Sequence, residues 1–174
     1  ESNLLEYITT EVENNALKIS TKKGYNLRTS KRMQVIITVP FKDIDKVALS
    51  GSGDIIGKDL ITAKNFKALI SGSGDISLSV KAKTIETALS GSGDIKLTGT
   101  TDKLSAKVAG SGDISCYDLK AKDVEAKVNG SGDVEVYASK SLYARVSGSG
   151  DIDYKGNPAN VDKKTSGSGD VTAH

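Results

Sequence analysis

Seven aspartates recur in the tetrapeptide Gly-Ser-Gly-Asp, and their type and spacing make them the first residues to consider for chemistry. They are Asp54, Asp75, Asp94, Asp113, Asp133, Asp151 and Asp170, separated by 21, 19, 19, 20, 18 and 19 residues. A serine lies two residues before each aspartate, at Ser52, Ser73, Ser92, Ser111, Ser131, Ser149 and Ser168. Carboxylates and hydroxyls repeated in this way could coordinate a cation, bind a ligand through hydrogen bonds, or serve the fold alone.

The elements that position these residues follow from the repeat. A near-constant period of about twenty residues is typical of stacked structural units. When the units are aligned on their aspartates, apolar residues occupy alternating positions on both sides of the motif, which places them on one face of a strand. Coils stacked about 4.8 Å apart would bury these positions as one continuous column. The sequence therefore predicts an all-β fold, a single-stranded, right-handed parallel β-helix (a solenoid) of about seven coils.

The same alternation assigns the motif residues to the inside or the outside of the coil. Both glycines of each motif share the inward parity, and we expect them where the chain bends and a side chain would collide. Cys116, the only cysteine, is also inward, and we expect a buried apolar residue rather than a reactive thiol. The serines and aspartates face outward. Stacked carboxylates repel by about 0.9 kcal/mol in water, which we expect hydrogen bonds from glycine N–H groups and serine hydroxyls to offset.

Residues 1–46 lack the repeat. Their pattern predicts two strands around a turn at Asn14 and Asn15, a basic loop from Lys22 to Lys31, and a strand from Met33 to Val39. We expect these N-terminal strands, which begin inside the domain, to cap one end of the coils formed by residues 47–174, within one structural domain overall. In the last unit, Lys163 and Thr165 replace apolar residues, which suits a polar end cap; docking of a second copy, giving a homo-oligomer, is the alternative.

Several functional classes lack support in the sequence. A formal charge of +2 from residues of both signs gives no basic surface for nucleic acid, and no apolar run has the length of a membrane span. Glycoside hydrolysis needs two carboxylates in unequal environments, whereas this row is uniform. The only histidine is the last residue, His174, and no Cys/His cluster is present for zinc. We therefore predict a non-enzymatic protein with no catalytic residues, no metal site and no cofactor.

Two further outward features add to the predicted binding surface. Tyr117 and Tyr137 follow their aspartates by four residues on neighbouring coils, as a stacked pair that could hold a sugar ring or simply stabilise the strands. A short basic row lies six residues before the aspartates, at Lys107, Lys127, Arg145 and Lys164. The predicted binding stripe consists of the seven serines, the seven aspartates and the two tyrosines. Calcium between stacked carboxylates is an alternative, although each coil has only one motif and differs from the calcium-binding nonapeptide of β-rolls.

The repeated Ser-Gly-Ser-Gly-Asp-Ile follows Asn3-Leu4-Leu5-Glu6-Tyr7-Ile8, Leu17-Lys18-Ile19 and Val35-Ile36-Ile37-Thr38-Val39-Pro40. Together these segments resemble the auto-transporter adhesin family called the head GIN domain, over essentially the whole chain. The resemblance implies a β-helical domain exported by Gram-negative bacteria to the periplasm, outer membrane or cell exterior, with its targeting segment outside this chain. That family has no established catalytic or binding residues to carry over.

From these observations we expect an adhesin-like or interaction scaffold that binds cell-envelope glycans, host glycans or a protein partner. Two alternatives are kept. One is a calcium-stabilised surface module that uses the aspartates, and the other is a degenerate polysaccharide-acting β-helix enzyme.

Overall fold

The structure is a computed structural model of the chain, and it describes residues 2–25 and 34–174. The chain forms two compact units, Glu1–Pro40 and Phe41–His174. Beyond Tyr25, the predicted basic loop lies outside the described residues, as does Met33 at the start of the third predicted strand.

The first unit contains an antiparallel hairpin. A 3-10 helix, η1 (Ser2–Tyr7), precedes β1 (Ile8–Glu13), which pairs with β2 (Ala16–Thr21). Asn14 and Asn15 connect the strands with φ angles of 50° and 62°, the left-handed geometry of a two-residue hairpin turn. The predicted pair of strands and its asparagine turn are confirmed, although the segment leading into β1 is helical.

The strand predicted from Met33 to Val39 is wrong over its described part. Residues 34–40 form no strand, and the Ile36 side chain is 80 % exposed. β-branched residues favour strands because they pack on a pleated surface beside a neighbouring strand. No described strand pairs with this segment, so its composition alone does not produce a strand.

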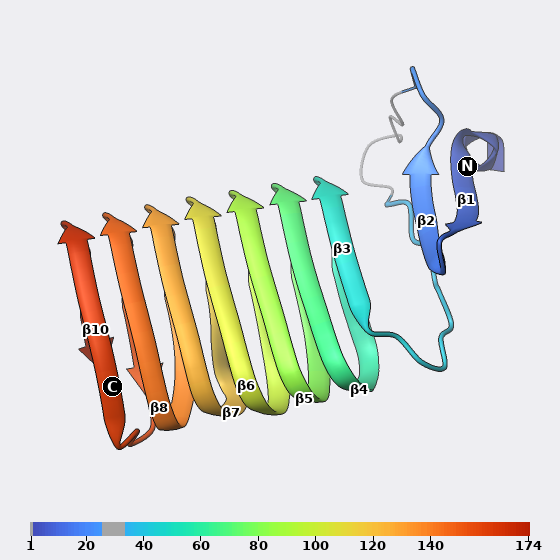
Figure 1. Cartoon of the computed structure of the whole chain (residues 1–174). Helices are drawn as coiled ribbons and strands as arrows, with labels where there is room; N and C mark the ends of the chain where they lie inside the picture. Colours follow the sequence, from blue (N-terminus) through green and yellow to red (C-terminus); the bar gives the residue numbers. More distant parts are fainter. Residues whose placement is uncertain (1, 26–33) are drawn as a thin grey trace. The chain divides into compact units, whose positions relative to one another are not determined.

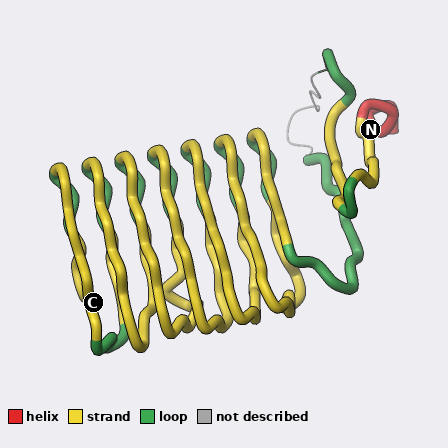
Figure 2. The backbone as a smooth tube through the Cα atoms, in the orientation of Figure 1, coloured by secondary structure: helices red, strands yellow, loops and turns green. Residues whose placement is uncertain are grey.

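The second unit is a parallel β-solenoid (Figures 1 and 2). Its strands are β3 (Lys46–Gly51), β4 (Ile55–Gly72), β5 (Ile76–Gly91), β6 (Ile95–Gly110), β7 (Ile114–Gly130), β8 (Val134–Gly148), β9 (Ile152–Lys155), β10 (Asn160–Gly167) and β11 (Val171–Ala173). Each of the long strands begins directly after an aspartate and ends at the first glycine of the next motif. The pairing order is β11-β9-β8-β7-β6-β5-β4-β3, with β10 also on β8. The predicted solenoid of about seven coils is confirmed.

The coils stack with equivalent positions in register. Ile76 pairs with Ile95 and Gly91 pairs with Gly110, so each motif lies beside the motif of the next coil. The spacing between motifs varies, and the register shifts take up these differences in the strand segment that follows the motif. One of these shifts lies between Cys116 and Lys120 of β7. A bulge of this kind removes residues from the ladder and redirects their side chains.

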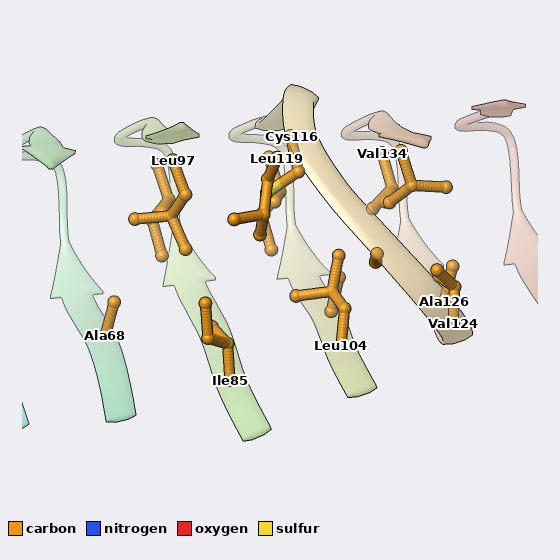
Figure 3. Close-up of a cluster of buried hydrophobic side chains, with 14 of the residues drawn as sticks. Ala68, Ile85, Leu97, Leu104, Cys116, Leu119, Val124, Ala126 and Val134 are labelled. Atoms are coloured by element: carbon orange, nitrogen blue, oxygen red, sulfur yellow. The ribbon is translucent and has the colours of Figure 1, made fainter. Parts of the chain in front are cut away.

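The core fills the space between the two strand segments of each coil. Figure 3 shows Ile85 and Leu104, from segments before a motif, with Leu97 and Leu119, from segments after one; all four are buried. Cys116 is 0 % exposed, and burial raises the pKa of its thiol to about 12. The inward parity derived from the sequence is therefore confirmed.

The last coil is closed by a polar side chain. Pro158 interrupts the coil between β9 and β10, because proline has no N–H for the ladder. Lys163, at a position that is valine or alanine in five of the six earlier coils, donates a hydrogen bond from Nζ to the carbonyl oxygen of Val171, 3.2 Å away. This contact joins β10 to β11 at the end of the solenoid.

Candidate functional site

The glycines of the motif are required by the stacking. The first glycine of each motif has φ between 113° and 145°, a conformation that other residues rarely adopt. A Cβ atom on the second glycine of the later coils would collide with the backbone of the coil before; at Gly112 it would lie 2.0 Å from the carbonyl oxygen of Gly93. A side chain at this position would therefore collide, as predicted, and the group that it would meet is the backbone of the neighbouring coil.

Consecutive aspartates are linked directly. The backbone N–H of each aspartate donates a hydrogen bond to Oδ1 of the aspartate one coil earlier, at distances from 2.7 to 3.3 Å. The residue after each of the first six aspartates donates in the opposite direction, to the following coil. For example, the N–H of Ile95, which follows Asp94, donates to the carbonyl oxygen of Asp113 at 2.9 Å. The donors expected from the sequence, glycine N–H groups and serine hydroxyls, do not bond to these carboxylates among the described residues, so that expectation is wrong. At the bend formed by each Gly-Ser-Gly-Asp motif, the aspartate carboxylate therefore replaces a backbone carbonyl as the acceptor in the hydrogen-bond ladder between coils.

The serines lie beside the aspartates on the outside of the coils. All seven serine side chains are exposed, and in the described part of the chain none of their hydroxyls makes a hydrogen bond within the protein. The seven serines and seven aspartates therefore form two adjacent lines along the solenoid, which we call the Ser–Asp row. Its hydroxyls are open to solvent, whereas one oxygen of each of the first six carboxylates is engaged by the next coil.

Tyr117 and Tyr137 do not form the expected stacked pair. The register shift in β7 leaves Tyr117 out of the ladder, and Tyr137 pairs with Lys120 instead. Each ring has a lysine over it. The Nζ atom of Lys120 lies 3.8 Å from the centroid of Tyr137, and that of Lys155 lies 4.0 Å from the centroid of Tyr117. These contacts are cation–π interactions.

A polar cluster that the sequence did not predict lies beside Tyr117. Ser115, Glu135 and Asp153 are in register on successive coils, two residues after their aspartates. Ser115 Oγ donates to Glu135 Oε2 at 2.6 Å, and His174 Nε2 lies 3.0 Å from Asp153 Oδ1. Burial, followed by the charges of Asp153 and Glu135, raises the pKa of Tyr117 to about 12. The common offset of these residues from their motifs was the sequence signal that could have identified the cluster. Both of its carboxylates already have a hydrogen-bonding partner within the protein.

The predicted basic row is in register, and two of its four members form ion pairs. Lys107, Lys127, Arg145 and Lys164 occupy paired positions on consecutive strands. Lys127 forms an ion pair with Glu125 at 2.5 Å, and Arg145 forms one with Asp162 at 2.8 Å. Arg145 also stacks on the ring of Tyr143, with Cζ 3.7 Å from the centroid. Acidic residues on the same face therefore pair with two of the four cations of this row, whereas Lys107 and Lys164 form no ion pair within the described residues.

A groove follows the coils on the strand segments after the motifs. Its volume is ≈ 580 Å³, and residues of successive coils line it at equivalent positions. Four lysines line it, and we call it the lysine groove: Lys81, Lys83, Lys120 and Lys122. Asp102 is the acidic residue of the lining and lies 2.7 Å from Lys122 Nζ; this hydrogen bond and charge hold the pKa of the Asp102 carboxyl below its usual value. This groove could not be predicted from the repeats aligned on their aspartates, because the lysines lie beyond the register shifts.

Two properties of the described residues bear on the class of site. No three or more His, Cys, Asp or Glu side chains among them are grouped to hold a metal ion. In residues 2–25 and 34–174, there is also no helix with the length and apolar character needed to cross a membrane.

Comparisons with known proteins agree with this architecture. Among solved structures, the chain is similar to a "putative adhesin" of Bacteroides fragilis NCTC 9343, with a TM-score of 0.90 and 29 % identity over 99 % of this chain and 79 % of that chain. It is similar to a "putative lipid binding protein" of Parabacteroides distasonis ATCC 8503, with a TM-score of 0.74 and 32 % identity over 99 % of this chain and 81 % of that one. A "putative adhesin" of the same organism gives a TM-score of 0.74 and 27 % identity over 99 % and 81 %.

A search of curated proteins found no match. The model of one protein family matches residues 1–158, and its description is "Putative auto-transporter adhesin, head GIN domain". The match spans most of the chain and includes both the hairpin and the repeated motif. The chain therefore belongs to the auto-transporter adhesin, head GIN domain family.

Proposed function

We propose that this protein is an exported, non-enzymatic adhesin-like scaffold that binds glycans of a cell envelope or host surface along the side of its solenoid. Membership of an adhesin family supports a role in surface interaction. The periplasm, outer membrane or cell exterior is the location that such a role requires. The ligand is placed on the side of the solenoid because Lys163 already bonds across the last coil.

One observation carries the proposal, namely that surface positions repeat in register from coil to coil. Ser90 pairs with Ala109, and Gly91 with Gly110, so equivalent positions around each motif lie side by side on successive coils. The spacing between coils is about 4.8 Å. A linear polymer also repeats its chemical groups at a fixed interval. Such a surface can therefore contact many units of a glycan chain at once, and weak contacts add to a stable complex.

The absence of catalysis is part of the proposal. Each of the first six aspartates of the Ser–Asp row accepts the same hydrogen bond, so no pair in the row has the distinct environments that an acid and a nucleophile need. Glu135 and Asp153 differ from the row, but Ser115 and His174 engage them. Incubation with acidic and neutral polysaccharides should release no products. Release of oligosaccharides would instead support the degenerate polysaccharide-acting enzyme.

The binding proposal is tested on an array of glycans and cell-wall fragments. We expect the whole chain to bind a subset of the polymers. A row variant carrying Ser92→Ala, Asp94→Asn, Ser111→Ala and Asp113→Asn keeps a carbonyl acceptor at both aspartate positions and should remain folded. Binding lost in this variant would assign the ligand to the Ser–Asp row, and binding unchanged in it would exclude the row as the contact face. No binding to any glycan would refute the proposed function.

A further inference from the structure

Fewer of the cations are paired in the lysine groove than in the basic row. In the described part of the chain, no carboxylate lies within ion-pair distance of Lys81, Lys83 or Lys120. Lys122 is paired with Asp102. The lining therefore carries four lysines against one aspartate, and three of the ammonium groups have no anionic partner within the described structure. A concave surface of one charge sign attracts ligands of the opposite sign.

The lysines are spaced regularly along the groove. Lys81 pairs with Thr100, and Thr100 pairs with Lys120, so the two lysines are two coils apart. At the usual strand spacing this separation is about 10 Å. Thr100 contributes a hydroxyl between them, and a threonine can donate or accept a hydrogen bond. The groove thus alternates cations with a neutral polar group.

The floor and length of the groove suit an extended chain rather than a compact ligand. Ala63, Ala82 and Ala121 line its floor in register through Thr101, and Ala82 and Ala121 belong to the buried core beneath it. The lining extends from Thr62 on β4 to Ser139 on β8, which are four coils apart. Four coil spacings correspond to about 19 Å. This length would accommodate several sugar rings of an extended polysaccharide.

Tyr137 sets the position of one of the cations. Lys120 Nζ lies 3.8 Å from the centroid of its ring, which holds the ammonium at the wall of the groove without neutralising it. The ring face is therefore occupied by a lysine rather than free for stacking by a nucleobase. Nucleic-acid single strands rely on free aromatic faces as well as positive charge. The groove favours a polymer whose anionic groups, and not its rings, are recognised.

We propose that this groove binds a linear acidic polysaccharide with one carboxylate on every second sugar. Its carboxylates would contact Lys81 and Lys120, since two sugar rings of an extended chain span about the distance between two such lysines, ~10 Å. Thr100 would contact the hydroxyls of the sugar between them. This inference rests on the proposed function, because it names the polymer class and the face of the solenoid that binds it.

The test uses the whole chain with hyaluronan oligosaccharides, which carry a carboxylate on alternate sugars, and with neutral dextran and oligothymidylate as comparison probes. The groove variant carries Lys81→Gln and Lys120→Gln. The matched control carries Lys107→Gln and Lys164→Gln, the same change in charge within the basic row. We expect wild type and control to bind hyaluronan alike, and the groove variant to bind about tenfold more weakly, with all three proteins folded at the assay temperature in thermal melts.

The outcomes separate the two proposals. Equal weakening in both variants, or equal affinity for oligothymidylate and hyaluronan, would overturn the groove assignment in favour of unspecific attraction of polyanions. Binding of neutral glycans with no binding of hyaluronan would overturn the groove assignment and leave the proposed function standing. Failure to bind any glycan, on this assay and on the array, would remove both.

Discussion

The backbone N–H of Asp113 donates a hydrogen bond to Oδ1 of Asp94, 3.1 Å away on the preceding coil. The same bond joins each aspartate of the row to the next one. A side chain therefore takes the place of a main-chain acceptor at the corner of each coil. This explains why an aspartate recurs there although neighbouring carboxylates repel each other.

Replacing one of these acceptors should weaken the solenoid. Oδ1 of Asp113 accepts the N–H of Asp133 at 2.8 Å, so Asp113→Ala removes one hydrogen bond, worth about 1 kcal/mol. Asp113→Asn retains a carbonyl acceptor and removes one charge from the row, and it should cost less. Urea unfolding of both variants measures the difference. Equal destabilisation by the two substitutions would show that the hydrogen bond is not the source of the effect.

Adding one methyl group should have unequal effects on stability at two equivalent glycines. In Gly112→Ala the new Cβ would lie 2.0 Å from the carbonyl oxygen of Gly93, so two coils must separate. At Gly53, on the first coil, nothing lies within 4 Å of the same atom. We expect a loss of several kcal/mol, or failure to fold, for Gly112→Ala, and little change for Gly53→Ala. Thermal melts of purified protein would decide, and a stable Gly112→Ala variant would be incompatible with this stacking.

A buried threonine offers a stabilising substitution. Thr87 is 0 % exposed, at a position where the next three coils have alanine, and its Oγ1 has no hydrogen-bond partner in the described structure. Thr87→Val keeps the shape and removes the unsatisfied hydroxyl. It should raise the free energy of unfolding by about 1 kcal/mol. Thr87→Ala, which leaves a small cavity, is the comparison. A destabilised valine variant would indicate that the hydroxyl has a partner in solution.

Tyr117 should ionise late in an alkaline titration. Its folded pKa is raised to about 12, chiefly by burial and also by Asp153 and Glu135, against an unfolded value of about 10. Because the neutral phenol is favoured in the fold, the resulting stability is present below about pH 10 and is lost as the pH rises through about 12. Absorbance at alkaline pH should show a step near pH 12 that Tyr117→Phe abolishes. The same step in the variant would assign it to another tyrosine.

Calcium should have little effect on stability. One oxygen of each of the first six carboxylates in the Ser–Asp row already accepts a backbone N–H. A ligand that binds only the folded state raises the melting temperature as its concentration rises. We therefore expect coinciding melting curves in millimolar calcium and in chelator. A shift of several degrees would favour the calcium-stabilised module over this account.

The sequence predicted the solenoid because its period and its alternation are independent signals of the same fold. Inward residues such as Ile95, Cys116 and Val134 could be assigned by parity alone, and all three are buried. The N-terminal hairpin was predictable from Asn14 and Asn15, since few residues adopt positive φ. The alternation of inward and outward side chains predicts burial correctly as long as the hydrogen-bond ladder between coils is uninterrupted.

The candidate site was less predictable because it depends on interruptions of that ladder. The shift between Cys116 and Lys120 separates Tyr117 from Tyr137 and aligns Lys120 with the groove. Bulges of this kind leave no clear mark in a single sequence. The donor to each aspartate also could not be deduced, because glycine, serine and aspartate N–H groups all lie near the corner. Composition likewise predicted a strand at residues 34–39, where no described partner strand exists.

The most direct measurement of the central claim is a crystal structure of the whole chain with a glycan selected on the array. The account predicts a ligand extended along the side of the solenoid, contacting equivalent positions on at least two successive coils, with the bonds between Asp94, Asp113 and Asp133 intact. A ligand confined to one coil or to an end of the solenoid would contradict it. Carboxylates of the Ser–Asp row turned away from the ladder to coordinate a cation would contradict it as well.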